Sequence, residues 1–269
     1  MITFSDQKWA AVDHDTTIAY RTIGDGPLHL LFMHGWAGSG AYFDDTLAYL
    51  DLAGIRAITL DLRGHGASDK PKQGYTLDQI AQDVIAVADH ASAAHFVLVG
   101  FSMSAKFAQY LAARYPDRVM GLILVAAFPV TEIPFPVETH QDWVGRAGDR
   151  GRLIEVTRMF LAQPVRDEIL ERWGNDAVKI PAYVLDETLK TACQTSFSDR
   201  LGVLQMPTLV VAGEQDPLYP PDLVASTIVS PLPHARIATL DCNHEIPIEK
   251  PRELAAIISA FLTGINADV

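Results

Sequence analysis

Cysteine is scarce in this sequence. Two cysteines, Cys193 and Cys242, occur among 269 residues, far apart and outside any CxxC pattern. A disulfide framework needs several cysteines and a zinc site needs closely spaced ligands, so the sequence favours neither. We interpret both as ordinary small hydrophobic side chains, and we expect no bound metal.

Basic residues are also few. The chain has 21 lysines and arginines against 33 acidic residues, which gives a net charge of −12, and the Lys and Arg residues form no cluster. A protein with this charge repels the phosphate backbones of nucleic acids and the surface of anionic lipids. We therefore expect no nucleic-acid partner.

Long hydrophobic runs are missing as well. The longest apolar stretch, Val119–Val130, is shorter than the ~18 residues that a membrane-spanning helix needs. Residues 1–15 contain neither the basic region nor the apolar segment of a signal peptide. We expect a cytoplasmic protein that does not contact a membrane.

The pattern that is present is that of a packed α/β protein. Short β-branched runs alternate with longer helical segments, as in βαβ units, which predicts a mostly parallel sheet. Near-continuous apolar character predicts buried strands at Leu28–Met33, Arg56–Leu60, His95–Val99, Val119–Ala126, Thr208–Ala212 and Ala235–Leu240. Before them, Lys8–Val12 and Thr17–Thr22 are expected to form an antiparallel entry to the sheet. Helices are expected at Tyr42–Ala53, Leu77–His90, Ala105–Tyr115, Pro221–Ser230 and Arg252–Leu262.

Between Pro129 and Asp199 the alternation stops. Amphipathic helices are expected there instead, at Arg152–Leu161, Val165–Trp173 and Val178–Thr191. Prolines after residue 128 mark the exit from the sheet. The sequence therefore predicts a core domain made of residues 1–128 and 200–269, with a helical cap at 129–199.

Ser102 lies where an apolar strand runs directly into a helix, in the segment Val97–Ala105. Such an elbow holds a serine hydroxyl at the carboxyl edge of the sheet, and Gly100 relieves crowding at the turn. The backbone N–H of Met103 then points toward an anion. A serine that simply caps a buried helix explains the segment equally well, so partners elsewhere must decide.

A nucleophilic serine needs a histidine base and a carboxylate that orients it. Asp216 follows the strand at 208–212, and His244 follows the strand at 235–240. The order Ser102, Asp216, His244 is the order expected of an α/β-hydrolase. Glu214 and Asp241 are competing carboxylates near the same edge, and a loop carboxylate is most often a solvated turn former.

The segment His34-Gly35-Trp36 follows another strand end, where a tetrahedral oxyanion needs a second backbone donor. We expect the N–H groups of Trp36 and Met103 to form that hole. A strand-end turn with a buried aromatic residue is the alternative.

The glycine-rich turn at 61–68 lacks the GxGxxG spacing of a nucleotide site. We interpret Asp61 and Arg63 as a buried hydrogen-bonded pair that shapes this loop. His34 and His65 are expected to be structural.

Together these segments resemble the α/β-hydrolase fold superfamily. The resemblance rests on HGW at 34–36, DLRGHGASDKP at 61–71, GFSMS at 100–104, GEQDP at 213–217 and NHEIPIEKP at 243–251. It implies an eight-stranded sheet with a helical cap, Ser102 as nucleophile, His244 as base and Asp216 as its orienter. It also implies that no metal or organic cofactor is needed.

Within the superfamily, HGW and GFSM are similar to bacterial arylesterases and perhydrolases, and HGW with a short cap also resembles the pimeloyl-carrier-protein methyl ester esterases. Ser104 departs from both, because it stands where GxSxG has its last glycine. GxSxS is similar to the strigolactone and karrikin receptors, which keep a triad and act mainly as sensors. We expect the Ser104 hydroxyl to bond to backbone, and the alternative is that it reaches the oxyanion pocket.

The leading hypothesis is a serine hydrolase that cleaves a small or medium-sized carboxylic ester or lactone through an acyl-enzyme. The alternatives are a slowly hydrolysing small-molecule sensor that recruits a partner protein, and a C–C hydrolase or lyase that uses the same triad. Fold alone does not choose among them. Candidate pocket walls are aromatic residues and a methionine in or near the insertion, which are equally consistent with plain core packing: Trp36, Phe128, Trp143, Met159, Phe160, Trp173 and Tyr183.

Overall fold

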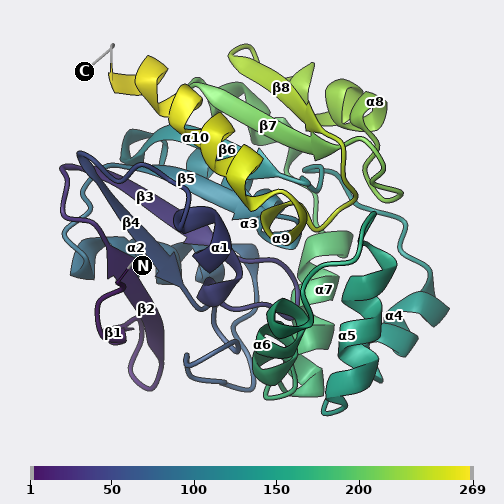
Figure 1. Ribbon diagram of the computed structural model, residues 1–269. Coiled ribbons are helices and arrows are strands. Elements are labelled where there is room, and N and C mark those ends of the chain that lie inside the picture. The colour runs from purple at the N-terminus through teal and green to yellow at the C-terminus, as the bar shows by residue number, and fades with distance from the viewer. Residues whose placement is uncertain (1–2, 267–269) are drawn as a thin grey trace.

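The computed structural model describes residues 3–266, and it is built on one eight-stranded sheet of order β1-β2-β4-β3-β5-β6-β7-β8 (Figure 1). β1 and β2 pair antiparallel, β2 pairs antiparallel with β4, and the remaining pairs are parallel. The mostly parallel α/β architecture predicted from the alternation is therefore confirmed. The strands are β1 (Lys8–Ala11), β2 (Thr17–Ile23), β3 (Leu28–Met33), β4 (Ile55–Leu60), β5 (Phe96–Phe101), β6 (Val119–Val125), β7 (Thr208–Gly213) and β8 (Ala235–Leu240).

The two faces of the sheet are covered by different helices, because parallel strands need crossover connections. α2 and α3 bury apolar side chains on one face, and α1 and α10 bury theirs on the other. The helices of this core are α1 (Asp44–Leu47), α2 (Leu77–His90), α3 (Met103–Arg114), α8 (Pro221–Val224), α9 (Ile246–Glu249) and α10 (Pro251–Asn266). Shorter helical turns are η1 (Gly40–Phe43), η2 (Pro116–Arg118), η3 (Ser198–Val203) and η4 (Ala225–Val229).

β5 extends two residues beyond the predicted strand end, to Phe101. Gly100 and Phe101 continue the parallel ladder by pairing with Leu124 and Val125 of β6. The strand therefore delivers the chain directly to Ser102, without a loop between them.

The single helix predicted at Tyr42–Ala53 is wrong. The structure has the 3-10 turn η1 and one turn of α1 there instead. After Ala48, the amides of Tyr49 and Leu50 bond to carbonyls three residues back. Tight turns thus replace the α-helical ladder, while Phe43, Leu47 and Leu50 still bury their side chains.

The segment between β6 and β7 is helical, and its helices lie together at one end of the molecule (Figure 1). The short helix α4 was not predicted; it begins after Pro136 in a segment with no buried residue, so it has little apolar periodicity to detect. The four helices are α4 (Val137–Val144), α5 (Arg150–Met159), α6 (Asp167–Ala177) and α7 (Ala182–Gln194).

Lys106 connects α3 to both ends of this helical segment. Its side chain is fully buried, and its ammonium group donates to the backbone oxygens of Thr131 at 2.8 Å, Ala192 at 2.7 Å and Thr195 at 2.6 Å. Burial lowers the pKa of Lys106 to about 8. Three carbonyl acceptors use all three N–H groups of the amine, so the charge is solvated by backbone rather than by an acid.

No helix among residues 3–266 is long and apolar enough to cross a membrane.

Candidate active site

Ser102 occupies a strained turn between β5 and α3. Its backbone angles are φ 54° and ψ −120°, a region that residues other than glycine rarely adopt. A Cβ on Gly100 would lie 2.8 Å from the Cα of Ala105, so only glycine lets the helix pass this close to the strand. Strain of this kind collects at functional sites, and the geometry is that of a nucleophile elbow.

The structure brings the predicted serine, histidine and aspartate into one hydrogen-bonded chain. Ser102 Oγ lies 2.8 Å from His244 Nε2, and His244 Nδ1 lies 2.7 Å from Asp216 Oδ2. The other Asp216 oxygen accepts from the amides of Leu218 and Tyr219 at 2.9 and 3.2 Å. All three side chains of this hydrogen-bonded series are buried, so its geometry is held by packing as well as by hydrogen bonds.

The two competing carboxylates, Glu214 and Asp241, do not bond to His244. Glu214 accepts from the hydroxyl of Thr239, and Asp241 accepts from the side-chain Nε2 of Gln215, both on exposed surface. The two-residue offset along the loop after β7 is what carries Asp216, rather than Glu214, to the imidazole.

The charges of Asp216 and His244 stabilise one another. Burial alone would raise the pKa of the Asp216 carboxyl, but the hydrogen bond and charge of His244 and two backbone amides hold it below its ordinary value. Burial alone would lower the pKa of His244, but Asp216 and the nearby carboxylates raise it above 6.5. The imidazole is therefore a stronger base than free histidine.

Two backbone amides next to the serine have no acceptor. Within residues 3–266, the N–H groups of Trp36 and Met103 make no hydrogen bond. Gly35 brings the first of these segments against the elbow, since a Cβ there would lie 3.3 Å from the Cβ of Ser102. Backbone N–H groups without an acceptor, one after a strand end and one at the start of a helix, can donate hydrogen bonds to an oxygen that becomes negatively charged.

Ser104, which replaces the usual glycine, is fully buried and donates its hydroxyl to the backbone oxygen of His34. The prediction that it bonds to backbone is confirmed. The bond connects the elbow helix to the segment that carries the Trp36 amide, so the extra side chain is used in holding the two together.

In the loop at 61–68, Asp61 and Arg63 have other hydrogen-bond partners than the ones predicted. The Asp61–Arg63 pair is wrong: Asp61 accepts from the amides of Gly40 and Ala67 at 2.7 and 2.8 Å. The turn at Gly64, with φ 83°, carries the Arg63 side chain away to α2, where it forms a bidentate bond with Asp83 at 2.7 Å.

His34 and His65 are buried beside one another. Burial lowers the pKa of His34 to about 4 and that of His65 to about 3. Both rings are therefore neutral at physiological pH. His34 Nε2 accepts from the amide of Leu62 at 3.0 Å, which is the structural role that was expected.

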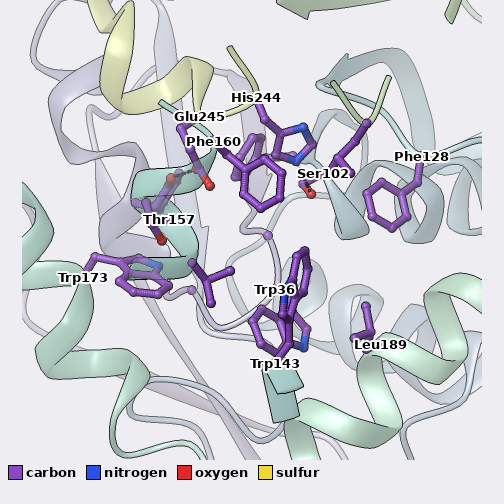
Figure 2. Close-up of a pocket in the computed structure, with 16 residues that line it drawn as sticks. Trp36, Ser102, Phe128, Trp143, Thr157, Phe160, Trp173, Leu189, His244 and Glu245 are labelled. Carbon is purple, nitrogen blue, oxygen red and sulfur yellow. Dashed lines mark hydrogen bonds between the residues drawn. The ribbon is translucent and has the colours of Figure 1, made fainter. Parts of the chain in front are cut away.

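A pocket opens onto Ser102 and His244 (Figure 2). Aromatic rings follow one another along it, with centroids 5.5 Å apart for Trp36 and Trp143 and 5.6 Å apart for Trp143 and Phe160. The Trp36 indole is fixed by a 2.9 Å hydrogen bond to the backbone oxygen of Leu185 in α7.

Five predicted walls line this pocket: Trp36, Phe128, Trp143, Phe160 and Trp173. Met159 does not: its side chain is 52% exposed and lies outside the lining. Thr157 of α5 and Phe160, three residues further on at the helix C-cap, face the pocket, whereas Met159 lies about 200° around the helix from Thr157. Tyr183 also lies elsewhere, with its hydroxyl on the backbone oxygen of Lys70 at 2.7 Å.

Sequence reasoning missed several lining residues. A polar residue directly after His244 was the available signal for Glu245, since a strand-end loop that delivers one side chain to a site also delivers its neighbour. No such signal marks the others, among them Tyr42, Thr157, Leu189 and Leu218. Among the described residues, no group of three or more His, Cys, Asp or Glu side chains is placed to hold a metal ion.

Comparisons with known proteins show which families the sequence is similar to. The sequence model of the alpha/beta hydrolase fold family matches residues 29–148. A non-heme haloperoxidase from Rhodococcus erythropolis is 28% identical over 82% of this chain and 86% of its own. The 3-oxoadipate enol-lactonase 2 of Acinetobacter baylyi is 26% identical over 94% of this chain and 95% of its own.

Solved structures show the same fold. A bromoperoxidase from Bacillus anthracis superposes with a TM-score of 0.87 at 22% identity, covering 96% of this chain and 100% of that one. An esterase from Exiguobacterium antarcticum superposes with a TM-score of 0.85 at 21% identity, covering 98% and 100%. The family-model match and these relatives support the assignment to the α/β-hydrolase superfamily that the ordered motifs predicted.

Proposed function

We propose that this hydrolase cleaves a small or medium-sized carboxylic ester or lactone through an acyl-enzyme on Ser102. The observation that carries the proposal is the buried chain from Ser102 through His244 to Asp216, which ends beside two free amides. A serine needs a base, an orienting carboxylate and an oxyanion site to act as a nucleophile.

The proposed reaction follows from these positions. Ser102 Oγ attacks the carbonyl carbon as its proton passes to His244 Nε2, and the carbonyl oxygen becomes negative facing the Trp36 and Met103 amides. The carbonyl–alkoxy C–O bond then breaks, and His244 returns the proton to the leaving alcohol. Water repeats the sequence: His244 takes its proton, the hydroxide adds to the acyl carbon, and Ser102 leaves with the proton as the acid is released.

We also propose that the helices between β6 and β7 act as a cap over the site. Each of them contributes a pocket-lining side chain: Trp143 from α4, Thr157 from α5, Trp173 from α6 and Leu189 from α7. A cap of this kind excludes water and selects the substrate by shape.

The lining points to an uncharged substrate. Some relatives are named for acids, such as 3-oxoadipate enol-lactonase 2 and 2-(acetamidomethylene)succinate hydrolase. The pocket here contains no lysine or arginine to pair with a carboxylate, and it contains Glu245. A site built for a carboxylate usually presents a cation.

A series of p-nitrophenyl esters, from acetate to octanoate, tests the proposal. We expect turnover on the order of 1 s⁻¹ or faster on the preferred ester, and single labelling of Ser102 by a fluorophosphonate. Labelling with less than about one turnover per minute would favour the sensor that the sequence left open. Cleavage of a β-diketone, with no ester cleaved, would favour the C–C hydrolase.

A further inference from the structure

The pocket contains a second buried carboxyl group that the proposed reaction does not use. Glu245 follows His244 in the chain, is 8% exposed and lines the pocket. Its Oε2 accepts a hydrogen bond from the hydroxyl of Tyr42. The Tyr42 ring is stacked on Phe101 with centroids 5.2 Å apart and planes at 14°. The carboxyl group is therefore held in one orientation.

The other oxygen of Glu245 has no donor. Two further side chains around it share this condition: within residues 3–266, the Thr157 hydroxyl and the Trp173 indole N–H make no hydrogen bond. Nor is any of the three atoms sealed away from solvent. Most polar groups of buried side chains in native proteins are paired. Three unpaired polar atoms on the wall of one pocket mark a place for a ligand.

These three side chains belong to one end of the pocket. The backbone amide of Glu245 bonds to the carbonyl oxygen of Phe160, three residues after Thr157 in the same chain segment. Trp173 and Tyr42 also line a smaller neighbouring pocket together. Figure 2 shows Glu245, Thr157 and Trp173 on the side of the pocket opposite Phe128 and Leu189, which are apolar.

The charges around Glu245 are unfavourable to an anion. Glu249 and Asp216 lie near enough to act on its carboxyl, and His244 is the basic side chain beside it. Burial raises the pKa of Glu245 to about 7. The group is thus an acceptor when ionised and a donor when protonated, and a substrate carboxylate would meet a like charge in a desolvated site.

We propose that Glu245, Thr157 and Trp173 form a polar subsite that selects esters or lactones bearing an uncharged hydroxyl group and rejects those bearing a carboxylate. A hydroxyl donates to Glu245 Oε1, and its two lone pairs accept from the Trp173 N–H and the Thr157 hydroxyl, so every open atom gains a partner. An ammonium group has no acceptor and leaves the indole N–H unpaired. This inference rests on the proposed ester hydrolysis, because it assigns the substrate class of the same pocket.

A competing role for Glu245 is support of the imidazolium, since its charge raises the pKa of the adjacent His244. That role acts on every ester by the same factor. A selectivity role changes the ratio between esters that differ by one hydroxyl, so matched substrates separate the two.

The experiment measures kcat/KM for two matched pairs, p-nitrophenyl butyrate with 3-hydroxybutyrate and hexanoate with 6-hydroxyhexanoate, and for the mono-p-nitrophenyl ester of succinate. We expect the protein to prefer the hydroxy ester in at least one pair and to cleave the succinate ester worst. Glu245→Met and the nearly isosteric Thr157→Val should each lower that preference about tenfold, the effect of one hydrogen bond. Glu245→Met should also raise the relative rate on the succinate ester.

Glu253→Gln, an exposed carboxylate on α10, is the control and should leave all ratios unchanged. If Glu245→Met lowers kcat/KM equally on every ester, Glu245 acts by supporting His244 and the subsite proposal is overturned. Unchanged ratios between the paired esters, or a preference for the succinate ester, would overturn it as well. If no ester is turned over, the proposed function fails by itself. The subsite is then tested by calorimetry of Ser102→Ala with ethyl 3-hydroxybutyrate, ethyl 6-hydroxyhexanoate, ethyl butyrate and ethyl hexanoate, where equal affinity within both pairs would refute it.

Discussion

Lys106 and Glu245 are both buried ionisable side chains, and neither forms an ion pair within the described residues. They differ in their hydrogen bonds. All three N–H groups of Lys106 reach backbone carbonyls, whereas Glu245 has one oxygen on Tyr42 and one facing the pocket. A buried charge is costly unless it is fully hydrogen-bonded. Lys106, whose N–H groups are all hydrogen-bonded, can stabilise the fold, and Glu245, which has an oxygen without a partner, is open to a ligand.

The same contrast exists within the first turns of α3. Ser102 and the Met103 amide stand at a strained turn with an unused donor, while Ser104 and Lys106 further along are fully paired. We expect substitutions at the helix start to change activity, and substitutions further along to change stability.

The largest effect is expected for Ser102→Ala. Its kcat should fall by about 10⁴-fold or more, because the triad acts as a unit and only binding and the oxyanion site remain. Its melting temperature should stay within about 2 °C, since the one bond that is lost, to His244 Nε2, lies at the pocket, where water can replace the serine hydroxyl. The measurements are ester hydrolysis and a thermal melt. Fluorophosphonate labelling that persists in the variant would disprove the assignment.

Lys106→Met, unlike Ser102→Ala, should lower stability. Removing the ammonium leaves three carbonyl oxygens without their donor, so the free energy of unfolding should fall by about 3 kcal/mol in urea titration. Lys8→Met, on the partly exposed strand β1, is the matched control and should change it by less than about 0.5 kcal/mol. Equal stability of the two variants would show that the buried ammonium is dispensable.

The pH dependence sharpens the comparison at the pocket. His244 must be neutral to accept the serine proton, and its pKa is raised above 6.5 by Asp216 and the nearby carboxylates. Activity is therefore full above this pKa and falls as the pH drops through it, so the acid limb of kcat/KM should lie above pH 6.5. Glu245→Gln removes a negative charge and should move that limb to lower pH. A limb that stays in place would show that Glu245 has no charge effect on the imidazole.

The smallest effect is expected for Ser104→Ala. The variant loses one hydrogen bond to the His34 carbonyl, which should cost about 1 kcal/mol of unfolding free energy, while kcat stays within about threefold. Enzyme assays and urea titration on the same preparation measure both. A tenfold loss of kcat at unchanged stability would instead move Ser104 into the oxyanion site.

The sheet was predictable because parallel strands covered on both faces are continuously apolar, a pattern that needs no tertiary information. The elements that were missed or misplaced lack such a pattern. α4 buries no residue, and the turns around α1 bury the same side chains that a helix would bury. The Arg63 side chain could not be placed, because the turn at Gly64 determines which carboxylate it meets.

The sequence by itself determined the residues on which the proposed chemistry rests: a strand-to-helix serine, and an acid and a histidine that follow later strands in the expected order. Parallel strands end at one edge of the sheet, so the loops that carry these residues lie close together there. Only the tertiary structure separated Asp216 from its neighbours Glu214 and Asp241, or showed that Glu245 faces the pocket with a free oxygen. Whether a buried polar atom is paired depends on groups distant in the sequence, and that information exists only once the chain has folded.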